Sequence, residues 1–435
     1  MQRQKTIAKW LAIVLLLTLA VGAYIIYDAL YIDAGGGANA SDTPADDPSS
    51  DLVPPDPPYY TTLPRSNGTY AGVTVGHAGG EGADTVLGAV FSEGGELVFF
   101  SSDSDEYDCR GAGLYAAAFD SEGLVAVNRF AEGDATFGGA KQTADGIAAL
   151  SSDDAGGKLT LFDFSGRVKG ECSLPSFTAA FPLAGGDGLY VFFSTETHLG
   201  CAVVESGLIV RESPFRLPEG GHTVREAMAG AGSFTLVTER EGEGTTVISF
   251  SESKGFSVKR EYADADFCQI LPIAGEDGAA WVLMTKSAGG LRLSVFGPSL
   301  ELEAETAIDG AGNAVMFGDG VSFTVVRTGV TETYCRHLDL VSSVPTGMTV
   351  GEVLFVRSDS SGKVFAHAEE GTMSVVRLDG NDAVTLMECV APPAGKVGYA
   401  LSGEKLLLAF STSDAEGIFF ENFGETDAYF VSMPV

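Results

Sequence analysis

The chain has 435 residues, 26 of them basic and 59 acidic, and its formal net charge is −33. Apolar residues make up 45% of the sequence and charged residues 20%, so most of the chain can bury a core. The large negative charge repels phosphate backbones, which disfavours nucleic acid as a ligand and leaves basic partners or cations.

The N-terminal segment has the pattern of a membrane anchor. Residues 10–27 form an uncharged run of eighteen residues, preceded by three basic residues and followed by the first acidic residue of the chain. About 18–20 helical residues approach the roughly 30 Å hydrocarbon core of a bilayer. We predict that residues 10–32 form a single-pass transmembrane signal anchor in the lipid bilayer. The positive-inside rule places residues 1–9 in the cytoplasm and the C-terminal domain outside the cell membrane.

A cleaved signal peptide is the main alternative to the anchor. Ala38, Asn39 and Ala40 have the small-x-small form of a cleavage site. However, this site lies more than ten residues beyond the uncharged run. The run is also longer than a usual signal-peptide core of roughly 7–15 residues, so we favour the anchor. Both interpretations export the remainder of the chain.

Residues 33–65 differ sharply in composition from the anchor. They are rich in Gly, Ala, Ser, Asp and Pro and contain few large apolar residues. Such a segment buries too little apolar surface to offset the entropy of ordering, and its Pro-rich half favours an extended, semi-rigid form. We predict a tether that holds a folded domain away from the membrane.

From residue 66 onward the sequence repeats. Short runs of β-branched, aromatic and aliphatic residues alternate with clusters of Gly, Asp and Ser, as β-strands do. A glycine turn precedes each of eight such runs, at intervals of 41 to 51 residues: Gly95, Gly146, Gly188, Gly232, Gly278, Gly320, Gly362 and Gly403. Each interval holds four strand-like segments, and this period is the signature of a β-propeller. We predict an all-β propeller of about eight four-stranded blades over residues 66–435, with seven blades as the alternative. Residues 69–75 are the candidate strand that closes the ring.

Within this class, the chain resembles the PQQ-like and outer-membrane-assembly propellers. The third strand of such a blade and its following turn contain apolar residues, then Asp, then Gly. Residues 114–123, 159–168 and 375–380 match this pattern loosely. The repeated tryptophan of PQQ-type blades is missing, since Trp281 is the only tryptophan after the anchor. A quinone cofactor is therefore not implied.

Catalytic motifs are absent from the sequence. Its five histidines, His77, His198, His222, His337 and His367, form no spaced metal pair, and neither a nucleophile elbow nor a P-loop is present. The six cysteines are dispersed over six repeats without a CxxC motif. We interpret them as small buried apolar residues, with a disulfide framework as the alternative.

Acidic residues are the one informative group. They concentrate in the loops between the second and third strand of each predicted blade, which open on one face of a propeller. The candidate ligand-binding residues are Asp103, Asp105, Glu106, Asp108, Asp153 and Asp154. Carboxylate oxygens of this kind suit calcium, the only cofactor that we consider, or a basic partner. The alternative is a solvated acidic surface that keeps the domain soluble.

Three functions are consistent with these features. We favour a non-enzymatic binding or scaffolding module for a protein, peptide or glycan at the cell envelope. An exported carbohydrate-active enzyme with carboxylates in the propeller channel is the first alternative. An envelope assembly factor is the second, and it rests on fold analogy alone.

Overall fold

The computed structural model describes residues 60–434 apart from several segments. The segments outside the description are 64–72, 79–81, 93–94, 104–108, 110, 121–122, 186–187, 207, 219, 231, 276–277, 311, 360–361, 381, 393–394, 403–404 and 414–425. The predicted anchor, residues 10–32, and the predicted tether up to residue 59 also lie outside it. Within the described part, no helix has the length and hydropathy needed to cross a bilayer.

The described strands form eight antiparallel sheets, numbered here as blades 1 to 8 in chain order. Blade 1 contains β3 (Thr85–Ser92), β4 (Gly95–Ser102), β5 (Gly113–Asp120) and β6 (Gly123–Glu132). Blade 2 contains β7 (Thr136–Thr143), β8 (Gly146–Asp153), β9 (Gly156–Phe162) and β10 (Val168–Leu174). Blade 3 contains β11 (Ala179–Gly185), β12 (Gly188–Ser194), β13 (His198–Glu205), β14 (Ile209–Glu212) and the short β15 (Leu217–Pro218), which pairs with β13. Blade 4 contains β16 (Thr223–Ala229), β17 (Phe234–Arg240), β18 (Gly244–Ser251) and β19 (Gly255–Tyr262).

The remaining four blades complete the series. Blade 5 contains β20 (Asp266–Gly275), β21 (Gly278–Ser287), β22 (Gly290–Phe296) and β23 (Leu302–Asp309). Blade 6 contains β24 (Ala314–Gly318), β25 (Ser322–Arg327), β26 (Val330–Cys335) and β27 (Leu340–Pro345). Blade 7 contains β28 (Glu352–Asp359), β29 (Gly362–Glu369), β30 (Thr372–Asp379) and β31 (Asp382–Val390). Blade 8 combines β32 (Val397–Ser402), β33 (Lys405–Thr412) and β34 (Asp427–Pro434) with β2 (Val73–Ala78) and β1 (Tyr60–Leu63).

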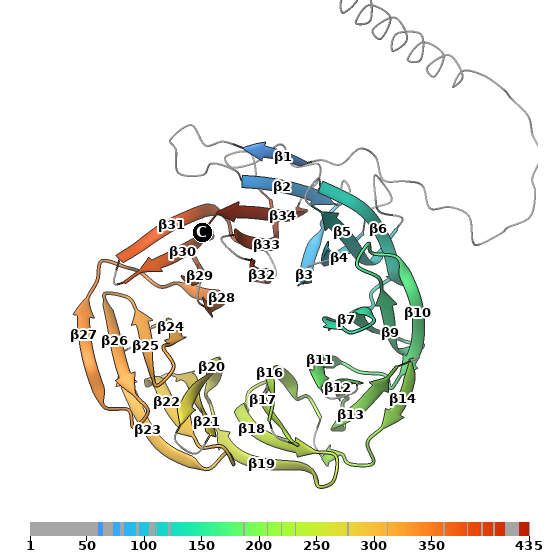
Figure 1. Ribbon diagram of the computed structural model, residues 1–435. Helices are drawn as coiled ribbons and strands as arrows, with labels where there is room; N and C mark the ends of the chain where they lie inside the picture. The colour runs from blue at the N-terminus through green and yellow to red at the C-terminus, as the bar shows by residue number, and fades with distance from the viewer. Residues whose placement is uncertain are drawn as a thin grey trace, which may run out of the picture. The chain divides into compact units, whose positions relative to one another are not determined.

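The blades stand radially around a central opening (Figure 1). The first strand of each blade lies innermost, and the chain then runs outward through the sheet. Each blade is apolar on both faces and buries them against its two neighbours. Between blades 1 and 2, for example, the ring of Phe99 lies 5.5 Å from that of Phe137 and 6.0 Å from that of Phe162. The hydrophobic core is thus a series of layers between neighbouring blades. A single four-stranded sheet could not bury its two apolar faces without these neighbours.

The predicted repeat of glycine turns is confirmed, and the seven-blade alternative is wrong. The second strand of each blade begins at the predicted glycine or two residues after it. Gly146 shows why this residue is needed at the turn. Its φ is +148°, and a Cβ atom there would lie 2.0 Å from the carbonyl oxygen of Phe162. Only glycine adopts this backbone without a clash.

The ring closes through strands from the two ends of the described chain. β2 pairs with β34, with Val75 opposite Val431, so the closing strand predicted at residues 69–75 is confirmed with a shift of a few residues. β1 then adds a fifth strand, with Thr61 opposite Val75, so these four residues of the range 33–65 belong to the sheet. At the junction with blade 1, the Val86 N–H donates to Ser411 Oγ at 2.6 Å.

Candidate functional site

The predicted acidic loops lie at one end of the blades, where the second and third strands are joined. Asp103 is exposed at the end of β4, and its carboxylate accepts the N–H of Ala83 at 3.2 Å. Asp153 is also exposed and accepts two N–H groups of its own turn, at 2.8 and 3.2 Å, beside the exposed Asp154. Asp105, Glu106 and Asp108 lie outside the described residues. Among the residues described, no group of three or more His, Cys, Asp or Glu is arranged to hold a metal ion, and calcium stays a prediction.

The corresponding turn of blade 4 pairs two of its acidic groups with arginines. A polar cavity of 550 Å³ opens here beside the start of blade 5. In its wall, Glu239 forms an ion pair with Arg225 and accepts the N–H of Phe267. Arg240 forms a second ion pair with Glu243 at 2.7 Å. Two acidic groups at this turn are therefore paired with arginines, whereas Glu241, Asp264 and Asp266 add further negative charge to the cavity wall.

Two buried histidines have structural roles. His222 lies 3.1 Å from Thr238 Oγ1 through its Nδ1 atom. His367 Nδ1 accepts the N–H of Gly351 at 3.0 Å, and burial lowers the pKa of this imidazole.

All six cysteines are free thiols, so the disulfide alternative is wrong. Cys109, Cys201 and Cys389 are buried, and the other three are partly buried. Burial raises the pKa of both Cys201 and Cys389 to about 12.

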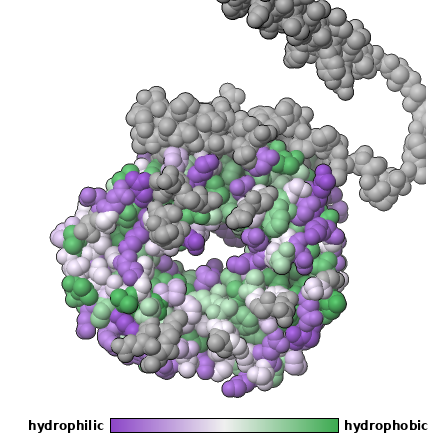
Figure 2. All heavy atoms as spheres, viewed as in Figure 1, coloured by the Kyte–Doolittle hydropathy of each residue, from purple (hydrophilic) through white to green (hydrophobic). Residues whose placement is uncertain are grey.

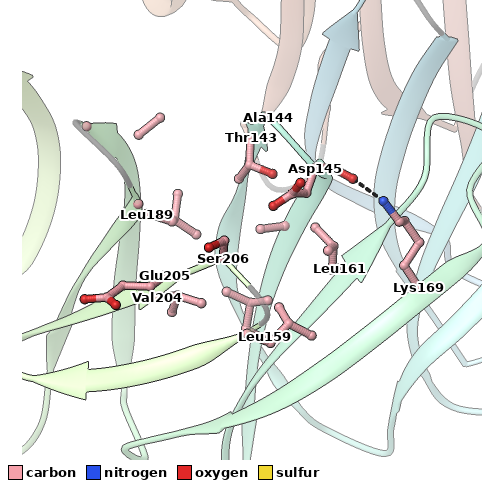
Figure 3. A pocket seen from close by; sticks show the side chains of 15 residues that line it. Thr143, Ala144, Asp145, Leu159, Leu161, Lys169, Leu189, Val204, Glu205 and Ser206 are labelled. Atoms are coloured by element: carbon pink, nitrogen blue, oxygen red, sulfur yellow. Dashed lines mark hydrogen bonds between the residues drawn. The ribbon is translucent and has the colours of Figure 1, made fainter.

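A second cavity, of 830 Å³, lies between blades 2 and 3. Its walls include the β7–β8, β11–β12 and β13–β14 turns, at the end of the blades opposite the acidic loops. We call it the interblade pocket (Figure 3). No pattern in the sequence predicted this pocket.

The interblade pocket has an apolar floor and a charged rim. The floor includes Leu159, Leu161, Leu189 and Val204, which extend the core between the two blades toward solvent. The rim carries five polar side chains, those of Thr143, Asp145, Lys169, Glu205 and Ser206. An apolar floor with a few polar groups at the edge is the usual composition of a binding pocket.

The rim charges are partly engaged. Lys169 Nζ donates to the backbone carbonyl of Asp145 at 2.6 Å (Figure 3). The ammonium group therefore contacts the main chain of Asp145 and not its carboxylate. Glu205 pairs with Arg211 at 3.4 Å, and Arg211 also contacts Glu252 at 3.2 Å. These carboxylates pull the pKa of Arg211 upward, so its charge is fixed. The rim therefore carries charges of both signs, and among its described residues Asp145 is the carboxylate that has no ion-pair partner.

Small residues explain why the space is open. Ala144, Ala148 and Ala184 face the cavity at positions where larger side chains would fill it.

Two further apolar side chains are exposed beside the interblade pocket, Val168 at 46% and Ile209 at 61%. Val168 begins β10 next to Lys169, and Ile209 begins β14 next to Leu208. Since Lys169 and Leu208 line the pocket, apolar surface continues from the cavity onto the outside of the ring.

Comparison with known proteins supports the architecture. The chain matches no protein-family model and no curated protein. It is similar to the solved Dos1 propeller, with 13% identity and a TM-score of 0.53 over 81% of this chain and 94% of that one. The chain is a β-propeller. The narrower resemblance to PQQ-like and outer-membrane-assembly propellers stays a prediction.

Two other solved structures share the general shape of this propeller. One is the dihydro-heme d1 dehydrogenase NirN in complex with DHE, at 14% identity and a TM-score of 0.48, covering 86% of this chain and 78% of that one. The other comes from a study of two prolyl endopeptidases, at 12% identity and a TM-score of 0.44, covering 75% and 54%.

Proposed function

We propose that this propeller is an extracytoplasmic binding module, tethered to the cell membrane by residues 10–32, that captures a protein or peptide partner. The observation that carries the proposal is the interblade pocket, because it combines an apolar floor with charged side chains at its mouth, among them the carboxylates of Asp145 and Glu205. The partner segment we infer is a large apolar side chain beside a lysine or arginine. The apolar group enters the pocket, and the cation meets Asp145 and Glu205.

Charge favours a basic partner over an acidic one. The chain has a net charge of −33, so a basic segment is attracted from a distance and an acidic one is repelled. At the rim itself, exposed ion pairs contribute only about 0–1 kcal/mol each. Charge therefore affects mainly the rate at which the partner is encountered and the orientation in which it binds.

The apolar floor supplies most of the affinity. Burying one leucine or phenylalanine side chain contributes about 1.5–3 kcal/mol, which corresponds to roughly a 10- to 150-fold change in Kd. A single anchored side chain gives weak binding by itself. The exposed Val168 and Ile209 beside the pocket extend the apolar contact to neighbouring residues of the partner.

The proposal is tested by closing the pocket. Ala184 lies at its mouth and is exposed, so Ala184→Trp fills the space without disturbing buried packing. The probe is an array of synthetic peptides that place Leu or Phe next to Lys or Arg, and binding of the purified full chain is measured by fluorescence polarisation. We expect Ala184→Trp to weaken binding by about tenfold or more, the loss of one buried side chain.

The matched control is Ala229→Trp, at the exposed end of β16 and away from the pocket. It should bind the peptides like the parent chain. Equal binding by Ala184→Trp and the parent, or equal binding of peptides in which Glu replaces the basic residue, would overturn the proposal. A glycan ligand, an envelope assembly role and a carbohydrate-active enzyme stay hypotheses from the sequence, for which the pocket offers no specific support.

A further inference from the structure

The outer edge of blade 6 differs in charge from the outer edges of most other blades. The fourth strand of a blade has one side without a neighbouring strand, and charged side chains usually protect such an edge from pairing with other chains. Six of the eight fourth strands carry at least two charged residues each: β6, β10, β14, β19, β23 and β31. The exceptions are β2 and β27, which contain no Asp, Glu, Lys or Arg.

The uncharged edge of β2 is covered by another part of the same chain. β1 pairs with β2 as an antiparallel fifth strand of blade 8, and its own sequence, Tyr-Thr-Thr-Leu, is also uncharged. Among the described strands, β27 pairs only with β26 and lies on the outside of the ring (Figure 1). Blade 8 therefore indicates which kind of segment fits an uncharged edge of this propeller, namely a short extended strand.

The main chain of β27 offers hydrogen-bonding groups at its outer side. Just beyond the strand, the N–H of Thr346 donates to the carbonyl of Gly329 at 3.0 Å. In an antiparallel ladder, hydrogen-bonded pairs alternate with non-hydrogen-bonded pairs. Val344, opposite Thr331, therefore bonds to β26, whereas Ser343 directs its N–H and C=O groups away from β26. Ser343 is exposed, so both groups are open to a further strand.

Apolar side chains lie at the start of the same strand. Leu340 is 52% exposed and Val341 is 65% exposed. Val341 is the extra residue of a β-bulge, so the regular edge begins at Ser342. In the space-filling view, hydrophobic residues reach the outside of the ring on the side where β27 lies (Figure 2). Side chains of an added strand gain packing contacts from such neighbours.

Charge and size argue against a second copy of this chain at the edge. Two chains with a net charge of −33 each repel one another. The six residues of β27 span about 20 Å, and one strand edge of this length is too small for the roughly 800 Å² that each partner buries in a stable interface. A short segment of a different, basic protein meets neither obstacle.

We propose that the open edge of β27 receives an extended segment of a protein partner as a fifth strand of blade 6. The segment is uncharged and rich in β-branched residues at its centre, as edge pairing requires, and has basic residues on both sides. Its main chain bonds to Ser343, which is the usual source of affinity in strand addition. This surface belongs to blade 6, whereas the interblade pocket lies between blades 2 and 3.

The test titrates the full chain into a labelled heptapeptide, Lys-Thr-Tyr-Thr-Val-Thr-Lys, and follows fluorescence polarisation. Ser343→Pro removes the N–H group that the edge offers, and an edge strand accepts proline where its N–H faces solvent. We expect this change to weaken binding by about fivefold or more, through loss of a hydrogen bond and obstruction by the ring. Ser343→Ala is the matched control, because it retains the N–H group and should bind like the parent chain.

A second measurement leaves the protein unchanged. Two versions of the peptide carry N-methyl groups on alternate residues, one on the even positions and the other on the odd positions. Because only one set of N–H groups in a strand faces β27, one version should lose binding and the other should retain most of it. Equal loss with both versions, or equal binding by the Ser343→Pro and Ser343→Ala chains, would overturn strand addition at this edge.

Three further results define the partner. A peptide with Glu in place of both Lys residues should bind more weakly, and equal binding would contradict selection of a basic segment. Sedimentation velocity of the full chain should show single copies; a dimer that Ser343→Pro abolishes would mean that a second copy occupies the edge, against the proposal. Ala184→Trp, which closes the interblade pocket, should leave binding of the heptapeptide unchanged, so each proposal succeeds or fails by itself.

Discussion

A backbone position with positive φ recurs where the third strand of a blade turns into the fourth. Gly166 occupies it in blade 2, and Leu300 and Leu338 occupy it in blades 5 and 6, with φ values of +80°, +64° and +64°. In each turn the N–H of this residue donates to the carbonyl three residues earlier, at 2.9–3.0 Å. A left-handed leucine costs roughly 1–2 kcal/mol, which Leu300 offsets by burying its side chain. Because leucine occupies the position in two of these three turns, a search for glycines does not reveal the shared turn.

The buried cysteines lead to a prediction about reactivity. Burial raises the pKa of Cys201 and Cys389 to about 12, so both are protonated thiols at pH 8, and the nucleophile is the thiolate. We expect iodoacetamide to leave these two residues unmodified in the native protein and to modify all six cysteines in denaturant. Peptide mass spectrometry measures the sites. Native alkylation of Cys201 at the denatured rate would contradict the structure.

The sequence located the acidic loops but not the hydrogen bonds and ion pairs that their carboxylates form. Asp103 and Asp153 accept backbone N–H groups nearby, and Glu239 is paired with Arg225. Such partners depend on which turns lie next to each other, and Arg225 comes from another strand than Glu239. A count of charges in a loop contains no information on these contacts.

At the scale of the element, β-bulges change the side-chain alternation of the inner strands. Five of these strands carry a register shift against the second strand of their blade, in β3, β7, β16, β20 and β28. A bulge inserts one residue and reverses which side chains face each side beyond it. In β16 the extra residue is Arg225, which forms the ion pair with Glu239. Simple alternation therefore does not predict which residues face the channel.

The closing strand β2 gives a prediction for stability. Five residue pairs join β2 to β34. A chain that starts at residue 82 lacks β2 and exposes the edge of a buried strand, so we expect it to lose about 3–5 kcal/mol, at ~1 kcal/mol per net hydrogen bond, and to aggregate. Denaturant unfolding followed by circular dichroism measures the change.

A chain that starts at residue 66 is the matched control, because it lacks β1 and retains β2. It should unfold close to the parent chain, since β1 pairs only four residues at the outer edge of blade 8. If both truncated chains were as stable as the parent, the closure through β2 would contribute nothing measurable.

For the whole molecule, the predicted anchor has its own test. The full chain should remain in the membrane fraction after alkaline carbonate extraction, because about eighteen uncharged residues are long enough to span a bilayer. A chain without residues 1–32 and expressed without export should be recovered in the soluble fraction. N-terminal sequencing distinguishes the alternative, since cleavage after Ala40 yields a protein that begins at Ser41. Release of the intact full chain by carbonate would contradict the anchor.

From the sequence alone we predicted the repeat, a ring of about eight blades with seven as the alternative, and a candidate closing strand at residues 69–75, and the structure confirms eight blades and a closing strand at Val73–Ala78. Each of these depends on local patterns, namely strand-like runs and the glycine turns between them, which recur in every unit. Only the tertiary structure decided where ligands fit. The interblade pocket requires Ala148 and Ala184, from neighbouring blades, to leave space at one end of a shared core. Closure of the ring brings such residues together, and no local pattern encodes that proximity.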